Sequence, residues 1–191
     1  MRILLFILFI IFPVLLFSQD EYSSLNKKEL KQLAKEKRRA EKEALDEQQG
    51  KITSRMIEYQ QFVLEADYIS GRSGSRIPVN STINFVIIDS TEATLQLGSP
   101  WGLGINGVGG ITVDGNVTKY EIFKKENKRG VSYNVSFFIM SSIGTYDIQM
   151  WISQSGHANA TVRGNYSGHL TYSGRLVPLS QSKIYKGHSF P

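Results

Sequence analysis

The hydrophobic pattern of this chain changes its period near residue 61, and that change constrains the fold more than any other feature. Before it, apolar residues recur at helical spacing; after it, they alternate one for one with polar residues. Such alternation is typical of a strand with one buried face. The sequence therefore predicts a mostly β domain of eight or nine short antiparallel strands in a meander, since no helical pattern separates them. A barrel and a sandwich both remain open.

Turn residues punctuate the strands. Asp89-Ser90-Thr91 predicts a tight turn, and Asp114-Gly115 between two alternating runs predicts a second hairpin, because Asp-Gly readily adopts the required positive φ angles. The first strand is expected to bury Phe62, Leu64, Ala66 and Tyr68 on one face and to expose Glu65 and Asp67 on the other.

The chain begins with Met1-Arg2 and an unbroken apolar run over residues 3–17. That run is shorter than the roughly 20 residues of a membrane-spanning helix, and a basic start with Pro13 favours a signal peptide over residues 1–19. Cleavage is expected beside Ser18 or Gln19. An uncleaved signal anchor is the alternative.

Residues 20–50 form a charged leader that is rich in Lys, Glu, Ala, Leu and Gln and is predicted to be helical. Asn26 and Glu29 have the spacing of a capping box. The apolar stripe is narrow, so the helix is either a solvated spacer or a weak coiled-coil or docking segment. Gly50 suggests an interruption, after which an apolar face at helical spacing should pack on the β-domain, residues 51–191. That face consists of Ile52, Met56, Ile57 and Tyr59.

Composition excludes several kinds of chemistry. The chain has no cysteine, which excludes disulfides, thiol catalysis and Cys-based metal sites. The formal net charge is +5, and residues 68–191 carry 11 Lys and Arg against 6 Asp and Glu. These charges are scattered, with the tight groups Lys124-Lys125 and Lys128-Arg129 beside one turn, so a nucleic-acid groove is not predicted.

Catalytic motifs are not assembled in this sequence. Residues 102–107 match G-x-G-x-x-G, but a strand pattern follows, whereas a dinucleotide site needs a helix there. His157, His169 and His188 lack the short spacing of metal ligands on one element, and Gly-x-Ser-x-Gly is absent. We therefore predict no catalytic residue, no cofactor and no metal site.

The long glycine-rich loop from Gly98 to Gly110 is the strongest candidate for contact with a ligand or partner. Loops of this length are usually functional or packed on the body of the domain. Its apolar residues either contact a ligand at a rim or close one end of the domain as a plug. These residues are Trp101, Leu103, Ile105 and Val108.

Three segments resemble a known family. Phe62-Val63-Leu64-Glu65-Ala66-Asp67, the stretch Gly107-Val108-Gly109-Gly110-Ile111-Thr112-Val113-Asp114-Gly115 and the tail Gly174-Arg175-Leu176-Val177-Pro178 are similar to exported bacterial proteins catalogued as domain of unknown function 4251. The resemblance extends from about Glu41 to Gly187. It implies the envelope of a Gram-negative bacterium, and it brings no activity, cofactor or catalytic residue.

The expected function is that of an exported, non-enzymatic binding or interaction module in the periplasm or at the periphery of the outer membrane. The alternative is a lipocalin-like carrier of a small apolar ligand, and the third is a hydrolase with an unrecognised site. An envelope protein or a small apolar molecule is the expected partner, nucleic acid is not, and membrane contact is limited to the signal segment or the periphery. An empty apolar cavity would favour the carrier, and a filled core with an exposed apolar patch would favour the interaction module.

Overall fold

The computed structural model describes residues 26–99, 104–127, 130–165 and 168–189. The chain divides into two compact units, Met1–Leu45 and Asp46–Pro191. The predicted signal peptide lies outside the described residues, as do Trp101 and Leu103. In the described part of the chain, no helix is both long and apolar enough to cross a membrane.

Helix α2 runs from Lys27 to Glu58. The Asn26 backbone N–H donates to the Glu29 carboxylate at 2.9 Å, so this half of the predicted capping box forms. The helix continues through Gly50, where the sequence suggested an interruption. A Cβ at Gly50 would lie 2.8 Å from the Gln154 side chain, which instead lies against the helix and donates to the Asp46 carbonyl. Glycine here leaves room for the Gln154 side chain to lie against the helix.

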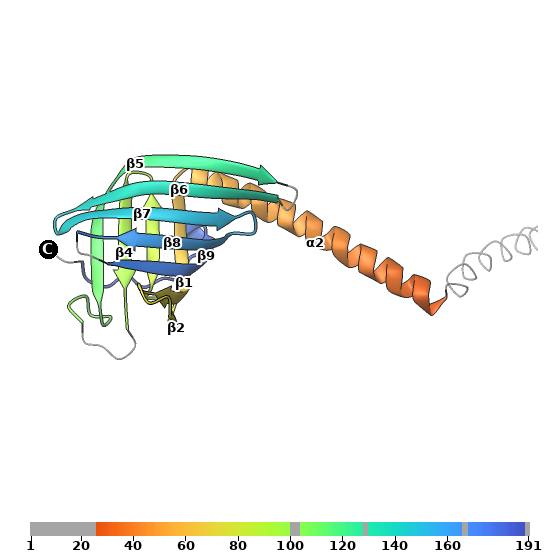
Figure 1. Ribbon diagram of the computed structural model, residues 1–191, viewed down its shortest axis with the longest axis horizontal. Helices are drawn as coiled ribbons and strands as arrows, with labels where there is room; N and C mark the ends of the chain where they lie inside the picture. Colours follow the sequence, from red (N-terminus) through yellow and green to blue (C-terminus); the bar gives the residue numbers. More distant parts are fainter. Residues whose placement is uncertain (1–25, 100–103, 128–129, 166–167, 190–191) are drawn as a thin grey trace, which may run out of the picture. The chain divides into compact units, whose positions relative to one another are not determined.

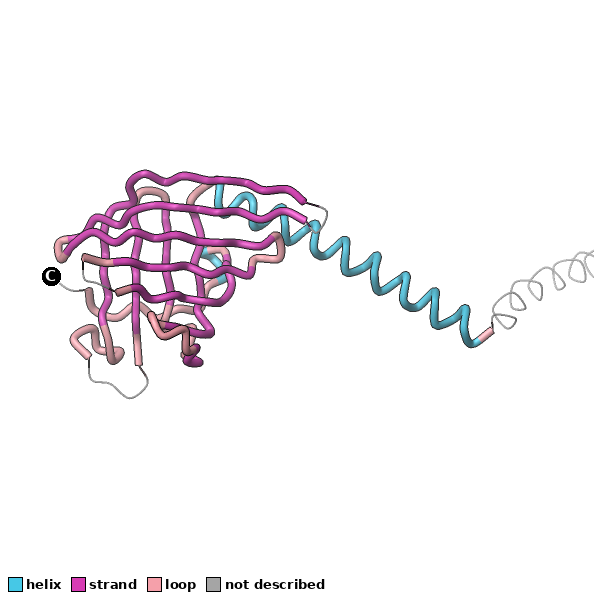
Figure 2. The backbone as a smooth tube through the Cα atoms, viewed as in Figure 1, coloured by secondary structure: helices cyan, strands magenta, loops and turns pink. Residues whose placement is uncertain are grey.

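The last turns of α2 pack on the β-domain, as the apolar spacing predicted, with Thr53, Met56 and Ile57 buried. Ile52 and Tyr59, which were expected on the same face, are exposed. The hydroxyl of Tyr120 donates to the Ile57 carbonyl at 2.9 Å. This end of the helix therefore closes one end of the β-structure, as Figures 1 and 2 show for residues 46–58.

Nine strands follow, and all their pairings are antiparallel. Eight of them close into a barrel because β1 pairs with both β3 and β9, while β2 is an extra short strand on β1. The mostly β meander is thus confirmed, and it is a barrel rather than a sandwich. The strands are β1 (Gln61–Ser70), β2 (Arg76–Pro78), β3 (Phe85–Asp89), β4 (Glu92–Leu97), β5 (Ile111–Asn127), β6 (Gly130–Ser141), β7 (Gly144–Ser153), β8 (His157–Arg163) and β9 (His169–Val177).

The seam between β1 and β9 contains a bulge. Ala66 pairs with Gly174 and Tyr68 with Ser173, so the register shifts at Asp67. A bulge reverses the alternation of faces beyond it. Tyr68, which simple alternation placed in the core, is therefore 43% exposed, and Ile69 is buried in its place.

The predicted hairpin at Asp114-Gly115 is wrong. Strand β5 continues through both residues for 17 residues, and β4 and β6 flank it on either side. A Cβ at Gly115 would lie 2.4 Å from the Met140 carbonyl oxygen, so glycine allows β6 to approach closely. Glycine is therefore needed at this Asp-Gly pair for a close contact between strands. Local turn preferences cannot distinguish this requirement from that of a hairpin turn.

The middle of the barrel is filled with side chains. Inward positions of all eight barrel strands contribute fully or almost fully buried residues, and the rings of Tyr120 and Phe137 pack with centroids 5.8 Å apart. Eight-stranded barrels have an interior just wide enough for side chains to fill. The largest fully buried side chains of this core include Tyr172, Phe62, Phe137, Leu64, Ile88, Ile139, Ile148 and Ile152.

Candidate small-ligand site at the open end of the barrel

An apolar pocket of about 310 Å³ lies at the end of the barrel opposite helix α2. The antiparallel order brings together here the ends of β4 and β8 and the starts of β5, β7 and β9. Nearly the whole lining is hydrocarbon. It consists of Leu95, Leu97, Ile111, Val113, Tyr146, Val162, Gly164, Gly168, His169, Leu170 and Tyr172.

Strand register explains why these side chains meet. Leu95 pairs with Val113 and Leu97 with Ile111, which gives one wall from β4 and β5. Val162 on β8 pairs with Leu170 on β9 in the other wall. Every second residue of a strand points to the same face of the sheet. The side chains of these three pairs therefore all point into the barrel and form successive layers toward its mouth.

Tyr172 is the polar feature of this apolar lining. Its side chain is fully buried, and no described residue accepts or donates a hydrogen bond at its hydroxyl. Burial raises the pKa of the Tyr172 phenol far above its usual value of 10, so the hydroxyl stays protonated and can act as a donor. A buried hydroxyl without a partner costs roughly 1–3 kcal/mol, and this oxygen has almost no accessible surface of its own.

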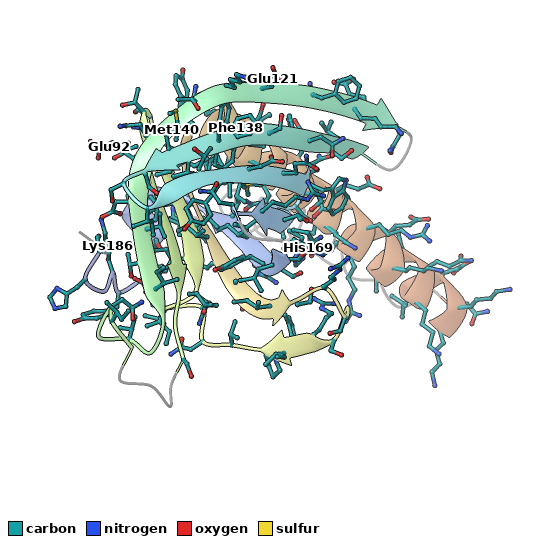
Figure 3. The ribbon with its side chains drawn as sticks, turned by 60° about the vertical axis from the view of Figure 1, so that its left-hand side comes forward. Glu92, Glu121, Phe138, Met140, His169 and Lys186 are labelled. Atoms are coloured by element: carbon teal, nitrogen blue, oxygen red, sulfur yellow. The ribbon has the colours of Figure 1, made fainter. Side chains whose placement is uncertain are left out.

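His169 lies at the rim of the same pocket, as the first residue of β9. Figure 3 labels it at the start of this strand. It adds a second polar group near the mouth. Among the described residues, none of the three histidines forms an ion pair with a carboxylate, and no group of three His, Asp or Glu side chains could hold a metal ion.

The glycine-rich loop reaches this end by connectivity, since it joins the last residue of β4 to the first residue of β5. Of its four candidate contact residues, Trp101 and Leu103 lie outside the described residues. Ile105 is 76% exposed and Val108 is half-buried, and neither lines the pocket.

Asn106 fixes the second half of the loop. Its buried side-chain amide donates to the Leu97 carbonyl and the Thr112 hydroxyl, at 3.3 and 3.1 Å. Its side-chain oxygen accepts from the backbone N–H groups of Val108 and Gly110. The G-x-G-x-x-G match therefore belongs to a loop that is packed through its own amides and followed by a strand.

The C-terminal tail covers the outer face of β4. The fully buried Gln96 donates to the carbonyls of Ile83 and Tyr185, and its oxygen accepts from the Gly187 N–H at 2.7 Å. The Glu65 carboxylate, expected to be solvated, accepts from the Ser182 hydroxyl at 2.6 Å. Sequence reasoning missed this network because an isolated Gln or Glu on a strand has the pattern of a solvated face.

Asp114 anchors the same tail. Its carboxylate lies 2.7 Å from the Lys186 ammonium and accepts from the Thr94 and Ser189 hydroxyls. Partial burial alone would raise the pKa of the Asp114 carboxyl. The hydrogen bonds from Lys186, Ser189 and Thr94 and the charge of Lys186 together outweigh burial and hold that pKa below its usual range.

The closed meander of eight strands and the apolar pocket at one end define an up-and-down β-barrel, a class whose interior can hold one small ligand. The chain belongs to the family Domain of unknown function (DUF4251), whose model matches residues 44–176. The resemblance seen in the sequence is thus confirmed.

A solved structure supports this assignment. The chain is similar to the crystal structure of a DUF4251 family protein from Bacteroides eggerthii DSM 20697, with 35% sequence identity and a TM-score of 0.60. The match covers 77% of this chain and 99% of that one. No curated protein matches this sequence.

Proposed function

We propose that this protein is an exported, non-enzymatic binding module of the cell envelope, and that it binds a small apolar molecule in the pocket at the open end of the barrel. The observation that carries the proposal is the almost entirely apolar lining of this pocket, which inward side chains from β4, β5, β8 and β9 build at the mouth of a closed barrel. The apolar run over residues 3–17 supports export to the periplasm or the periphery of the outer membrane.

The pocket restricts the chemistry of the ligand. Its volume of about 310 Å³ is at the lower end of the 300–1,000 Å³ of small-molecule sites. Among the described residues, the lining offers mostly apolar surface, with the polar groups of Tyr146 and His169 beside it and no carboxylate. The expected ligand is therefore compact and mostly hydrocarbon. The missing carboxylates disfavour a hydrolase site here, since acid–base cleavage needs positioned proton-transfer groups.

Native mass spectrometry of the mature protein, purified gently from the envelope of its own host, tests the proposal directly. We expect an added mass that organic solvent extracts and that corresponds to a compact apolar molecule. A bare chain mass together with no affinity for apolar probes would contradict the carrier and favour the interaction module.

A neutral fluorescent ketone, 6-propionyl-2-dimethylaminonaphthalene, provides a binding assay. Val162→Trp fills the pocket and should abolish the blue-shifted emission of the bound probe. Tyr172→Phe should leave probe binding almost unchanged, since the hydroxyl that it removes has almost no accessible surface. The same change should stabilise the ligand-free protein by about 1 kcal/mol, because it removes an unpaired buried hydroxyl.

Ile105→Trp is the matched control. It also adds a large ring near the same end, but on a residue that is 76% exposed and does not line the pocket. Probe binding that survives Val162→Trp as well as it survives Ile105→Trp would place the probe elsewhere and would overturn the site.

A further inference from the structure

A second hollow, of about 660 Å³, lies on the outer face of the sheet formed by β5, β6, β7 and β8. Apart from Ile122, Val135 and Met150, its lining residues occupy outward positions of these strands, whereas the pocket at the barrel mouth is built from inward positions. The two sites share no lining residue. Figure 3 labels Glu121 of β5, which lines this hollow.

Two neighbouring rows of side chains cross the four strands. In the first row Phe123 pairs with Asn134, Asn134 with Trp151, and Trp151 with Asn159, so aromatic rings and amides alternate. In the second row Glu121, Ser136, Gln149 and Thr161 follow one another, and all four are polar. The hollow thus presents ring faces and hydrogen-bonding groups side by side.

These groups are available to a ligand. Trp151 is 46% exposed and Phe123 is 65% exposed. The exposed amides of Asn134, Gln149 and Asn159 form no hydrogen bond within the described residues. Single exposed apolar residues are normal on a protein surface, but two aromatics in one row with unpartnered amides between and beside them are not explained by packing.

Charge identifies the kind of ligand. The chain is basic overall, with a net charge of +5, yet the one charged side chain in this lining is Glu121. Single-stranded nucleic acid also stacks on aromatic rings, but it needs a positively charged groove along its backbone. The hollow therefore suits a ligand that is neutral, rich in hydroxyl groups and apolar on its ring faces.

We propose that this outer face binds a neutral oligosaccharide chain. The C–H faces of its sugar rings stack on Trp151 and Phe123, and its hydroxyls exchange hydrogen bonds with Asn134, Gln149 and Asn159. Adjacent strands are about 4.8 Å apart, so the two aromatic residues are spaced by roughly 10 Å across the sheet. That spacing allows one extended sugar chain, running across the strands, to contact both rings.

The test uses the full mature chain with Trp101→Phe. This background leaves Trp151 as the sole tryptophan, because the sequence contains two. Its fluorescence is titrated with hexasaccharides of glucose, N-acetylglucosamine and mannose, and calorimetry provides an independent Kd. We expect at least one of these sugars to bind saturably and to shift the Trp151 emission.

Variants assign the binding to this face. By calorimetry, Trp151→Ala should weaken binding about tenfold or more, and Phe123→Ala and Asn134→Ala should each weaken it severalfold. Tyr59→Ala is the control, since it removes an aromatic residue that is 70% exposed but lies outside the hollow. Trp151→Phe should restore part of the affinity, because a smaller ring still stacks.

Three outcomes would overturn the proposal: no hexasaccharide binds, binding is the same in Trp151→Ala as in Tyr59→Ala, or an oligothymidine strand binds this face while the sugars do not. Failure here is distinct from failure of the apolar site. Val162→Trp blocks the barrel mouth and should leave sugar binding unchanged.

Discussion

Gly174 stands where the first and last strands of the barrel meet. It pairs with Ala66 across the closing seam, and a Cβ at this position would lie 1.9 Å from the Glu65 carbonyl oxygen. The obstacle is backbone, which cannot move aside without breaking the pairing at the bulge. Closure of the barrel therefore depends on the absence of one methyl group.

Gly174→Ala should lower the free energy of unfolding by about 2–4 kcal/mol, in the range of substitutions that overpack a close contact. Urea denaturation monitored by circular dichroism measures the change. Gly168→Ala is the control, because a Cβ there meets nothing within 4 Å, and it should have little effect. Equal stabilities for the two variants would contradict this role of Gly174.

The sequence shows where glycines stand but not what approaches them. Gly115 and Gly174 both face carbonyl oxygens from strands that are distant in the chain, and no local preference reports such a partner. The same holds for Tyr172, since a tyrosine in an alternating strand has the same pattern whether its hydroxyl is paired or not. Both candidate binding sites were therefore beyond prediction at the level of the residue.

At the scale of elements, the tail over residues 182–189 replaces solvent on the outer face of β4 and the start of β5. Gln96 and Asp114 bind it from the barrel side. The pKa of Asp114 is lowered in the folded protein, so its carboxylate stabilises the bound tail above the ordinary pKa of 3.8. That contribution is lost as the pH falls through the lower, folded value.

Hydrogen exchange of the Gly187 and His188 amides tests this anchor. Their protection should fall up to about fivefold below pH 3.8, since a half-exposed ion pair contributes about 0.2–1 kcal/mol. Asp114→Asn should show the lower protection already at neutral pH. Glu92→Gln removes an exposed carboxylate nearby and should not. A tail whose protection in Asp114→Asn equals that of the unaltered protein would contradict the anchor.

Periodicity predicted the elements better than turn chemistry did. The strands β6 and β7 bury alternate residues, in agreement with the alternation that predicted the meander, and Met56 and Ile57 pack on the β-domain as expected. At Asp114-Gly115 and at Tyr68 a close strand contact and a bulge override local preference, and at Gly50 and Glu65 packing against other segments does the same. These are tertiary effects, which a single sequence does not reveal.

At the scale of the whole molecule, the chain divides at Leu45 into two units. In the first, Leu30, Leu33 and Leu45 of α2 are exposed. In the second, Met56 and Ile57 of the same helix are buried. The division implies that the stability of the barrel resides in the second unit.

Deleting residues 20–45 from the mature chain should therefore change the free energy of unfolding of the barrel by less than about 0.5 kcal/mol, the usual range for surface changes. Urea denaturation measures this, and Ile57→Ala, which empties a fully buried position, provides a destabilised reference at about 2–5 kcal/mol. A deletion that destabilises as much as Ile57→Ala would assign the leader a structural role.

The meander could be predicted from the sequence because apolar and polar residues alternate in every run. The closure of the sheet into a barrel could not be predicted. Whether β1 meets β9 depends on strand tilt and stagger summed around the sheet, and no local pattern reports that sum. The choice between barrel and sandwich therefore had to come from the structure.

Closure through β1 and β9 also governs when this protein can fold. Leu64 pairs with Leu176, so the decisive contact joins the two extremes of the domain and gives the barrel a high contact order. A chain emerging from the ribosome cannot complete the ring until its last strand is available. For a protein proposed to cross a membrane before it works, that delay leaves the ring open for as long as the last strand is still being made.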